Sequence, residues 1–209
     1  MMRLRAMLMI GMLFLITACN NPASDTSKAV TGEAAQVTPQ AVKGQKYLIT
    51  PQNSKIEFVA SKVTRSHHGA FQRFAGEIDF VETVEKSRVS ITIETNSVTT
   101  DEADLTKHLQ TPDFFDVAKF PQATFVSTAI KPGGEKGASH TITGNLTLHG
   151  VTKSITFPAT ISVTADVATV DGTFHIDRKD FGINYAGAAD NLIRDEVVLT
   201  LQVRANKAS

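Results

Sequence analysis

The chain has 209 residues, and its 21 basic and 21 acidic side chains give a formal net charge of zero at pH 7. A neutral chain lacks the positive field that attracts nucleic acid, so we expect no nucleic-acid partner. It contains a single cysteine, which excludes an internal disulfide, so a hydrophobic core must stabilise the fold.

The N-terminus has the parts of a secretory signal. Arg3 and Arg5 give it positive charge, and an unbroken run of small and apolar residues follows from Ala6 to Ile16. This run is too short to span a membrane, because a spanning helix needs about 20 apolar residues. We therefore expect residues 1–18 to form a signal peptide that is removed from the mature protein.

The signal ends in the string Ile16-Thr17-Ala18-Cys19, which resembles the bacterial lipobox. In lipoproteins with that motif the cysteine thiol is acylated, and cleavage then makes the cysteine the mature N-terminus. Because the only cysteine stands where the motif requires it, we expect a lipid on Cys19 and membrane anchoring through it. The alternative is an ordinary signal cut near Ala18, which would leave Cys19 as a free thiol in an oxidising compartment.

The expected location is the cell envelope, on the periplasmic face of a membrane. Two or more acyl chains on one residue anchor a protein stably, whereas a single chain gives only marginal binding. The residue after the cysteine is Asn20, and not the Asp that favours retention of enterobacterial lipoproteins at the inner membrane. The outer membrane is therefore favoured over the inner one in a host that uses that rule.

Residues 19–45 are expected to form the lipidated N-terminus and a flexible tether. They are rich in Ala, Ser, Thr, Pro, Gln and Asn and contain few large apolar side chains. Such a segment cannot bury enough surface to offset the entropy that it would lose on ordering. No internal repeat or second change of composition follows, so we expect one folded domain at 46–209.

The domain has the alternating pattern of antiparallel strands. Ile142, Leu146 and Leu148 alternate with Thr and Asn, for example, which is typical of a strand with one buried face. Turn signals such as His149-Gly150 separate the runs, and Pro158 interrupts one of them, which indicates a bulge or an edge position there. The pattern predicts eight or nine strands, at about 46–50, 54–63, 71–80, 87–96, 122–131, 139–149, 151–164, 167–177 and 195–204.

The exception to this pattern is a short helix at 101–109. Its first turn is acidic, its end is basic, and Leu105 and Leu109 lie on one face, before Pro112 stops it. Many short, evenly spaced strands with one helix are typical of a barrel or a sandwich. A barrel of about eight strands has either a filled interior or room for one small ligand, and the helix could cover one of its ends.

Six strings in the domain resemble those of the YceI family of polyisoprenoid-binding, lipocalin-like periplasmic proteins, and they lie in the family's order between about Lys46 and Ala205. The resemblance implies an all-β fold, an antiparallel lipocalin-like β-barrel of about eight strands with one short helix. It also implies an apolar tunnel that holds the tail of an isoprenoid such as a quinone. The lipobox is a departure, because many relatives have a plain cleavable signal. The strings are GAFQRFAGEI at 69–78, HLQTPDFFDV at 108–117, FPQATF at 120–125, GNLTLHGVTK at 144–153, DRKDFGI at 177–183 and DEV at 195–197.

The inward-facing apolar residues of the strands are the expected wall of the ligand site. Any one such residue is more often plain core than ligand wall, and it is the family resemblance that implies a tunnel. A bound isoprenoid lipid is the expected ligand, and we expect no cofactor. The expected wall residues are Phe58, Ile78, Phe80, Ile91, Ile93, Phe125, Leu146, Leu148, Phe157, Phe174, Ile176, Leu199 and Leu201.

Arg178, Asn184 and Tyr185 are candidates for contact with a ligand headgroup. Arg178 lies at a strand end, where its guanidinium could instead anchor the following loop through carboxylates and carbonyls, and we favour this structural role. Asn184 and Tyr185 could contact a quinone carbonyl near the barrel mouth, or they could simply satisfy backbone groups.

The sequence offers no catalytic or metal-binding constellation. Nucleophilic catalysis needs an activated Ser or Cys with a base, and no Gly-x-Ser-x-Gly is present. The six histidines show no spacing that places two of them on one face of one element, as a zinc site would. We therefore expect neither an enzyme activity nor a metal site.

Two functions remain open at this point. The first is the binding, storage or transport of an apolar isoprenoid lipid, such as a polyprenyl quinone, in the hollow barrel of a membrane-anchored periplasmic lipoprotein. The second is a structural or stress-related envelope lipoprotein with a filled core and no lipid ligand. The sequence leaves the oligomeric state open, with a dimer as one option.

Overall fold

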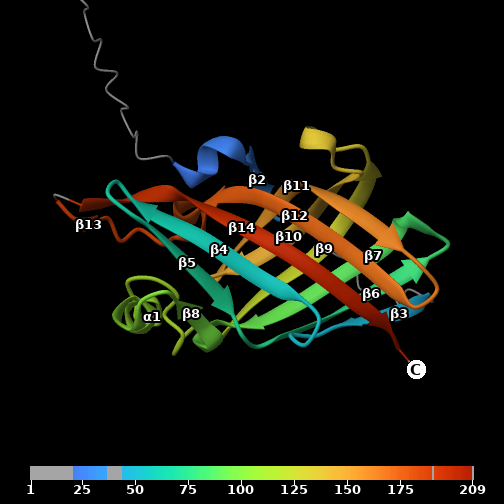
Figure 1. Cartoon of the computed structure of the whole chain (residues 1–209), viewed down its shortest axis with the longest axis horizontal. Helices are drawn as coiled ribbons and strands as arrows, with labels where there is room; N and C mark the ends of the chain where they lie inside the picture. Colours follow the sequence, from blue (N-terminus) through green and yellow to red (C-terminus); the bar gives the residue numbers. More distant parts are fainter. Residues whose placement is uncertain (1–20, 37–43, 190, 209) are drawn as a thin grey trace, which may run out of the picture.

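The computed structural model describes residues 21–36, 44–189 and 191–208 (Figure 1). The expected signal peptide and the expected lipidation site, Cys19, lie outside the described residues. The described strands form one continuous sheet, which is antiparallel except where β1 pairs with β12.

Eight strand positions, here called staves, close this sheet into a barrel. Their order is β12-β11-β10-β9-β7-β6-β3-β14, and β14 pairs with β12 to complete the circle. Two of these positions are each shared by two strands. β3 and β4 together occupy the position beside β14, because they pair with its opposite ends, and β6 and β5 occupy the next position, because they pair with β3 and β4 in turn. The antiparallel β-barrel of about eight strands expected from the sequence is confirmed. Its strands are β3 (Gln45–Ile49), β4 (Lys55–Lys62), β5 (Ser66–Phe71), β6 (Phe74–Val81), β7 (Thr83–Glu94), β9 (Gln122–Pro132), β10 (His140–Leu148), β11 (Val151–Val163), β12 (Val167–Asp177) and β14 (Asn191–Lys207).

Alternation along each strand turns one row of side chains inward. On β10, Ile142 is 2% exposed, while Thr147 faces outward with its hydroxyl 2.9 Å from that of Thr152 on β11. The two strands are joined by the turn His149-Gly150, whose φ angles of 51° and 75° are those of the type I′ turn that suits a twisted hairpin. The period-two pattern and the turn signal of the sequence therefore have the structural roles expected of them.

One end of the barrel is packed solid. Tyr47, Ile49, Ile78 and Val203 are at most 4% exposed and belong to one core cluster. The Tyr47 hydroxyl donates to the carbonyl oxygen of Thr164 at 2.7 Å, so its polar group is satisfied within the barrel. This end is therefore a plain hydrophobic core.

The helix α1 (Ala103–Leu109) lies at the end of the barrel opposite β3 (Figure 1). It falls within the segment expected from the sequence, ends before Pro112, and is the one α-helix of the described residues. Nothing helical in the described ranges is both long enough and apolar enough to cross a bilayer. The remaining short elements of the domain are the strands β8 (Val98–Thr100) and β13 (Gly187–Ala188) and the 3-10 helices η2 (Thr95–Ser97), η3 (Glu135–Gly137) and η4 (Arg178–Phe181).

Residues 22–33, here called the strap, form part of the barrel wall. The strap contains η1 (Pro22–Asp25), β1 (Ser27–Lys28) and β2 (Val30–Glu33). β1 runs parallel to β12, and β2 runs antiparallel to β11. The flexible tether expected at 19–45 is therefore wrong for the described residues 21–36.

Polar contacts hold this segment in place. The Ala29 amide donates to the carbonyl oxygen of His175 at 2.8 Å, and Ala35 exchanges hydrogen bonds of 2.7 and 2.9 Å with the side-chain amide of Asn145. Composition does not reveal this docking, because strand pairing satisfies backbone groups whatever the side chains are.

The strap occupies a gap between residues 153–158 of β11 and 172–177 of β12, here called the seam. The two strands pair directly only where Thr160–Val163 lie opposite Ala168–Asp171. The backbone N–H of Ile161 donates to the Ser139 hydroxyl, on the edge of β11 that faces β10. Because successive N–H groups of a strand point to opposite edges, the N–H groups of the even-numbered residues of β11 point toward β12. Pro158 has no N–H to donate on that side, and the ladder ends beside it. The edge position expected at Pro158 is therefore found at the seam.

The inward side chains of the strap are small. Ser27 is 4% exposed and Ala29 is 1% exposed, whereas Val30, the first residue of β2, faces out and is 70% exposed. The hydroxyls of Ser27 and Thr31 are buried without a hydrogen-bond partner among the described residues. A buried hydroxyl without a partner costs about 1–3 kcal/mol, so these two groups weaken the docking of the strap.

Ala29→Asp is expected to undock the strap, because the new carboxylate would be buried without a partner. Since the strap can leave the seam while the barrel stays folded, the cost should appear as local opening. We expect proteolysis within residues 21–36 to accelerate on the order of tenfold, with little change in the urea midpoint of the barrel. Val30→Asp, at a position 70% exposed, is the matched control and should be cleaved like the wild type. Equal cleavage of all three proteins would contradict a docked strap.

Candidate ligand-binding cavity

The barrel is hollow at the end that α1 covers. The cavity offers about 160 Å³ to the centre of a water molecule, roughly ten times or more what one water needs. Its lining side chains are all apolar except that of Arg178. The cavity ends where the packed core begins, so it is a blind pocket and does not run through the whole barrel as a tunnel.

Most of the wall residues expected from the sequence border this cavity, and two do not. Ile78 and Phe80 lie on β6 beside β3, in the packed end of the barrel. Alternation predicts which face of a strand points inward, but it does not predict the height of a residue along the barrel. The expected residues that do border the cavity are Phe58, Ile91, Ile93, Phe125, Leu146, Leu148, Phe157, Phe174, Ile176, Leu199 and Leu201.

Other wall residues were not predicted. Leu109 of α1 and the adjacent pair Phe114 and Phe115 border the cavity from the segment that covers its mouth. The apolar pair in an otherwise polar stretch was the signal that could have found them. The remaining additions, from the strands and from the segment after η4, are Ile56, Ala60, Phe71, Ala123, Ile155, Ile183, Ile193 and Val197.

Phenylalanine rings form two sides of the cavity. Phe157 of β11 and Phe174 of β12 reach toward each other from the two sides of the seam, and their rings stack with centroids 4.1 Å apart. On β5, the ring of Phe71 lies 5.8 Å from that of Phe58 and 5.7 Å from that of Phe115. Offset and tilted contacts of this kind add to the stabilisation from burial alone.

Two glycines give these rings their space. A Cβ atom at Gly69 would lie 2.2 Å from the ring of Phe58, and one at Gly144 would lie 2.4 Å from the ring of Phe125. Both separations are too short for real atoms. The rings can therefore lie along the wall only because these two strand positions have no side chain.

Arg178 borders the cavity, but its guanidinium is occupied by the protein. The residue is 4% exposed; Nε donates to the carbonyl oxygen of Arg194 at 3.1 Å, Nη1 to that of Ile183 at 2.7 Å, and Nη2 to the Asp195 carboxylate at 3.1 Å. These contacts tie the segment after η4 to the first residues of β14, which is the structural role that the sequence analysis favoured.

The other two headgroup candidates have different positions. Asn184 is exposed and does not border the cavity. Tyr185 is 37% exposed, and its ring packs edge-on against those of His108 and Phe114, with centroids 5.1 and 5.3 Å away. Because Phe114 belongs to the cavity wall, Tyr185 lies at the rim of the cavity.

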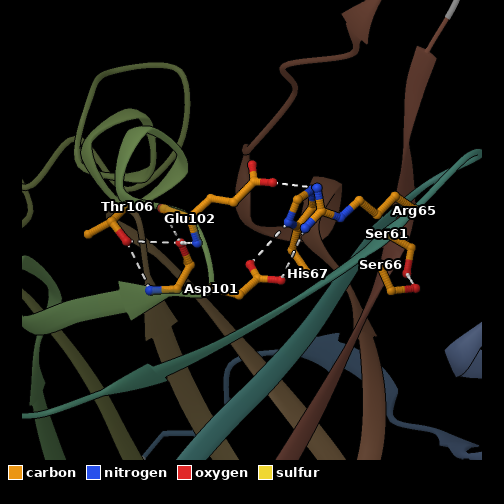
Figure 2. Close-up of polar contacts among 8 residues, drawn as sticks. Ser61, Arg65, Ser66, His67, Asp101, Glu102 and Thr106 are labelled. Carbon is orange, nitrogen blue, oxygen red and sulfur yellow. Dashed lines mark hydrogen bonds and ion pairs between the residues drawn. The ribbon is translucent and has the colours of Figure 1, made fainter.

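Charged side chains hold the segment that contains α1, which covers the mouth of the cavity, to β5 and the residue before it (Figure 2). A carboxylate oxygen of Asp101 lies 3.1 Å from Nδ1 of His67, and the Glu102 carboxylate accepts a hydrogen bond from Arg65. These four residues are here called the latch. Within the described part of the chain, no group of three or more His, Cys, Asp or Glu side chains could hold a metal ion.

The latch fixes the charge of Asp101. Burial acts to raise the pKa of this carboxyl, but the hydrogen bond to His67 and the charges of His67 and Arg65 outweigh it, so the pKa lies below its usual value of 3.8. Asp101 is therefore an anion at neutral pH and can accept the hydrogen bond from His67 and attract the Arg65 guanidinium.

Comparison with protein families and curated proteins gives consistent matches. The family model described as the YceI-like domain matches residues 47–205. A UPF0312 protein of Pseudomonas putida is 39% identical over 133 residues, which cover 60% of this chain and 68% of that protein.

Solved structures share the fold. The crystal structure of BcnA from Burkholderia cenocepacia matches with a TM-score of 0.66 at 27% identity, over 75% of this chain and 99% of that one. A polyisoprenoid binding domain from Saccharophagus degradans matches with a TM-score of 0.63 at 18% identity, over 79% of this chain and all of that one, 100%. At this low identity the second likeness shows the fold alone.

Asp101→Asn is expected to destabilise the fold at neutral pH, by up to about 1 kcal/mol for a partly exposed pair, and to have no effect in acid. A carboxylate with a depressed folded-state pKa stabilises the fold above its unfolded pKa, and this contribution is lost as the pH falls through the folded value. The difference in urea midpoint from wild type should therefore be full above about pH 5 and should vanish as the pH falls below 3.8.

Asp104→Asn is the matched control for this measurement. Asp104 lies on α1, its side chain is 98% exposed, and its one ion pair among the described residues is with the exposed Lys107, so its removal should change the midpoint little at any pH. A midpoint difference for Asp101→Asn that stays constant from pH 7 to pH 3 would show that the latch does not depend on the charge of Asp101.

Proposed function

The chain belongs to the YceI-like family, and from this premise we propose that its barrel binds the apolar tail of an isoprenoid lipid, such as a polyprenyl quinone, for storage or transport. The observation that carries the proposal is the blind cavity, whose wall is apolar apart from Arg178. The Saccharophagus domain of the same fold, which is a polyisoprenoid binding domain, supports an isoprenoid as the class of ligand.

The size of the cavity argues against the alternative of a structural lipoprotein with a filled core. A void leaves the atoms around it without contacts, at a cost of about 24 cal/mol per Å³. For about 160 Å³ this amounts to about 4 kcal/mol, which an apolar ligand would recover by filling the space.

The dimensions of the cavity suit a short isoprenoid segment. Its wall on β14 runs from Ile193 to Leu201, which at about 3.3 Å per residue and a tilt of about 40° is about 20 Å along the barrel axis. An extended isoprene unit advances on the order of 5 Å over four bonds of about 1.5 Å, so about four units fit. Each buried five-carbon unit contributes roughly 4 kcal/mol before the ordering cost of the tail is subtracted.

We propose binding without catalysis. Among the described residues Arg178 is the one polar side chain on the cavity wall, and its donors are engaged by the protein. A reaction on the bound tail would need a nucleophile or a base beside it, and the wall supplies neither.

We also propose that Cys19 is lipidated and holds the barrel at the periplasmic face of a membrane, with the outer membrane favoured over the inner one. The support for this is the lipobox-like string with the sole cysteine of the chain at its end, followed by Asn20. A membrane-held barrel would lie next to the bilayer in which isoprenoid lipids reside.

Leu146→Asp and Phe125→Asp are each expected to abolish the co-purification of lipid. The two residues lie opposite each other on β10 and β9 and both border the cavity, so either carboxylate would stand unpaired in an apolar space, at a cost of several kcal/mol. Thr147→Asp, the next residue on the outer face of β10, is the matched control and should retain lipid. The measurement is extraction and mass spectrometry of lipid from each protein purified from its native host, with circular dichroism as the test of folding.

A folded Leu146→Asp protein that still carries a stoichiometric isoprenoid would show that the lipid is not bound in this cavity. If the wild type itself carries no apolar molecule and binds no added quinone, the structural alternative would take the place of lipid binding.

Cys19→Ser is expected to move the protein from the membrane fraction to the soluble periplasmic fraction, because stable anchoring depends on the acyl chains. Asn20→Asp keeps the cysteine and should shift the protein from outer-membrane to inner-membrane fractions in a host that sorts by that residue. Immunoblots of fractionated cells measure both outcomes. An unchanged distribution of Cys19→Ser would contradict the anchor.

A further inference from the structure

The seam is a part of the barrel wall that only a few groups close. On the cavity side, Phe157 and Phe174 meet from β11 and β12 with their rings 4.1 Å apart, and both border the cavity. On the outer side, β1 and β2 pair with the free edges of the same two strands. Ile155 of β11 and Ile176 of β12 border the cavity beside these rings, so the seam is closed by four apolar side chains and by the strap.

The strap buries little apolar surface. Of its residues from 27 to 33, Ala29 alone belongs to the core cluster, whereas the neighbouring strands contribute Ile and Phe side chains. The buried hydroxyls of Ser27 and Thr31 lack partners, which further favours undocking.

The barrel does not need the strap in order to stay closed. β11 and β12 remain joined through the pairs between Thr160–Val163 and Ala168–Asp171, and each strand is also paired with its other neighbour along its length. Removal of the strap would therefore leave only the side chains between β11 and β12 to close the wall at the seam, and a window would open there once the two rings part, while the eight staves keep their order.

The end of the barrel offers a less direct route. There Leu109, Phe114 and Phe115 border the cavity from the segment that covers the mouth, and the latch residues Asp101 and Glu102 tie this segment to β5. A ligand that entered at this end would have to displace large apolar side chains and break charged pairs.

We propose that the seam is a lateral entrance to the cavity and that the strap is its gate, which leaves the seam when an apolar ligand enters or departs. The inference deepens the proposed function and rests on it, because a gate needs a cavity that takes a ligand. The strap begins at Pro22, three residues after Cys19, so in the anchored protein the window would lie close to the bilayer.

A disulfide across the seam tests the gate. Val30 and Thr156 lie directly opposite each other in the antiparallel pairing of β2 with β11, on the outer face, where the Cα spacing of a strand pair suits a disulfide. The variant carries Val30→Cys and Thr156→Cys in the full chain with Cys19→Ser, so that the two new thiols are the only ones. The matched control carries Thr147→Cys and Thr152→Cys, an outward pair on β10 and β11 that does not bridge the seam.

The measurement is stopped-flow fluorescence of the neutral apolar dye N-phenyl-1-naphthylamine. In the oxidised seam variant we expect the association and dissociation rates to fall together, on the order of tenfold or more, while the Kd stays unchanged, because a gate raises the barrier equally in both directions. Reduction should restore both rates. The control disulfide should leave the rates at the wild-type values in either redox state.

A second variant needs no disulfide. Ser27→Ala with Thr31→Val removes the two unpartnered hydroxyls, so the strap should dock more tightly and both rates should fall on the order of tenfold. This variant decides the question if the cysteine variant does not fold.

The possible failures are distinguishable. Dye binding that remains intact, with unchanged rates in the oxidised seam variant, would overturn the gate alone and show that ligands pass beneath α1. Absence of dye binding by the wild type would overturn the proposed function, and this inference with it.

Discussion

The hydrogen-bonding requirement of a closed barrel is the constraint on which the other features depend. Each stave must find backbone partners along both edges, and β11 and β12 meet this requirement with each other over only a short stretch. Pro158 has no N–H to continue the ladder, so both strands need a further strand beyond it. Residues 27–33 supply that strand. The seam, the strap and the pair of rings between them therefore follow from one residue without an amide hydrogen.

Side-chain size decides where the barrel is full and where it is hollow. The same inward alternation runs along every stave, but at the β3 end it presents side chains such as Tyr47 and Ile78, which interlock into a core. Toward α1 it presents Gly69 and Gly144, and the space that they free is taken by rings that lie along the wall. A core and a cavity can therefore share one barrel, and the cavity needs no departure from the ordinary rules of strand packing.

The sequence predicted the parts of the fold that depend on local pattern. Strands with large apolar residues on alternate positions and the helix before Pro112 were expected near their observed positions, whereas β5 was missed because its inward residues include His67 and Gly69. The strap was misjudged as a tether because its backbone pairs leave no mark in composition. Ile78 and Phe80 were predicted to line the cavity, but they lie in the packed end of the barrel. Alternation of apolar residues predicts which face of a strand points inward, and it does not predict the position of a residue along the barrel axis.

The docked strap also sets how far the barrel could range from an anchor at Cys19. From Cys19 to the start of η1 at Pro22 there are three residue steps, which span at most about 10 Å. If the strap left the seam, the chain between the anchor and the barrel would run from Cys19 to the start of β3 at Gln45. That length of chain has a contour of about 90 Å and, as a free chain, a typical end-to-end distance of about 30 Å. One movement would therefore both open the barrel wall and lengthen the connection between the barrel and its anchor. Entry of a ligand at the bilayer and the distance that the barrel can move from the bilayer would then be coupled.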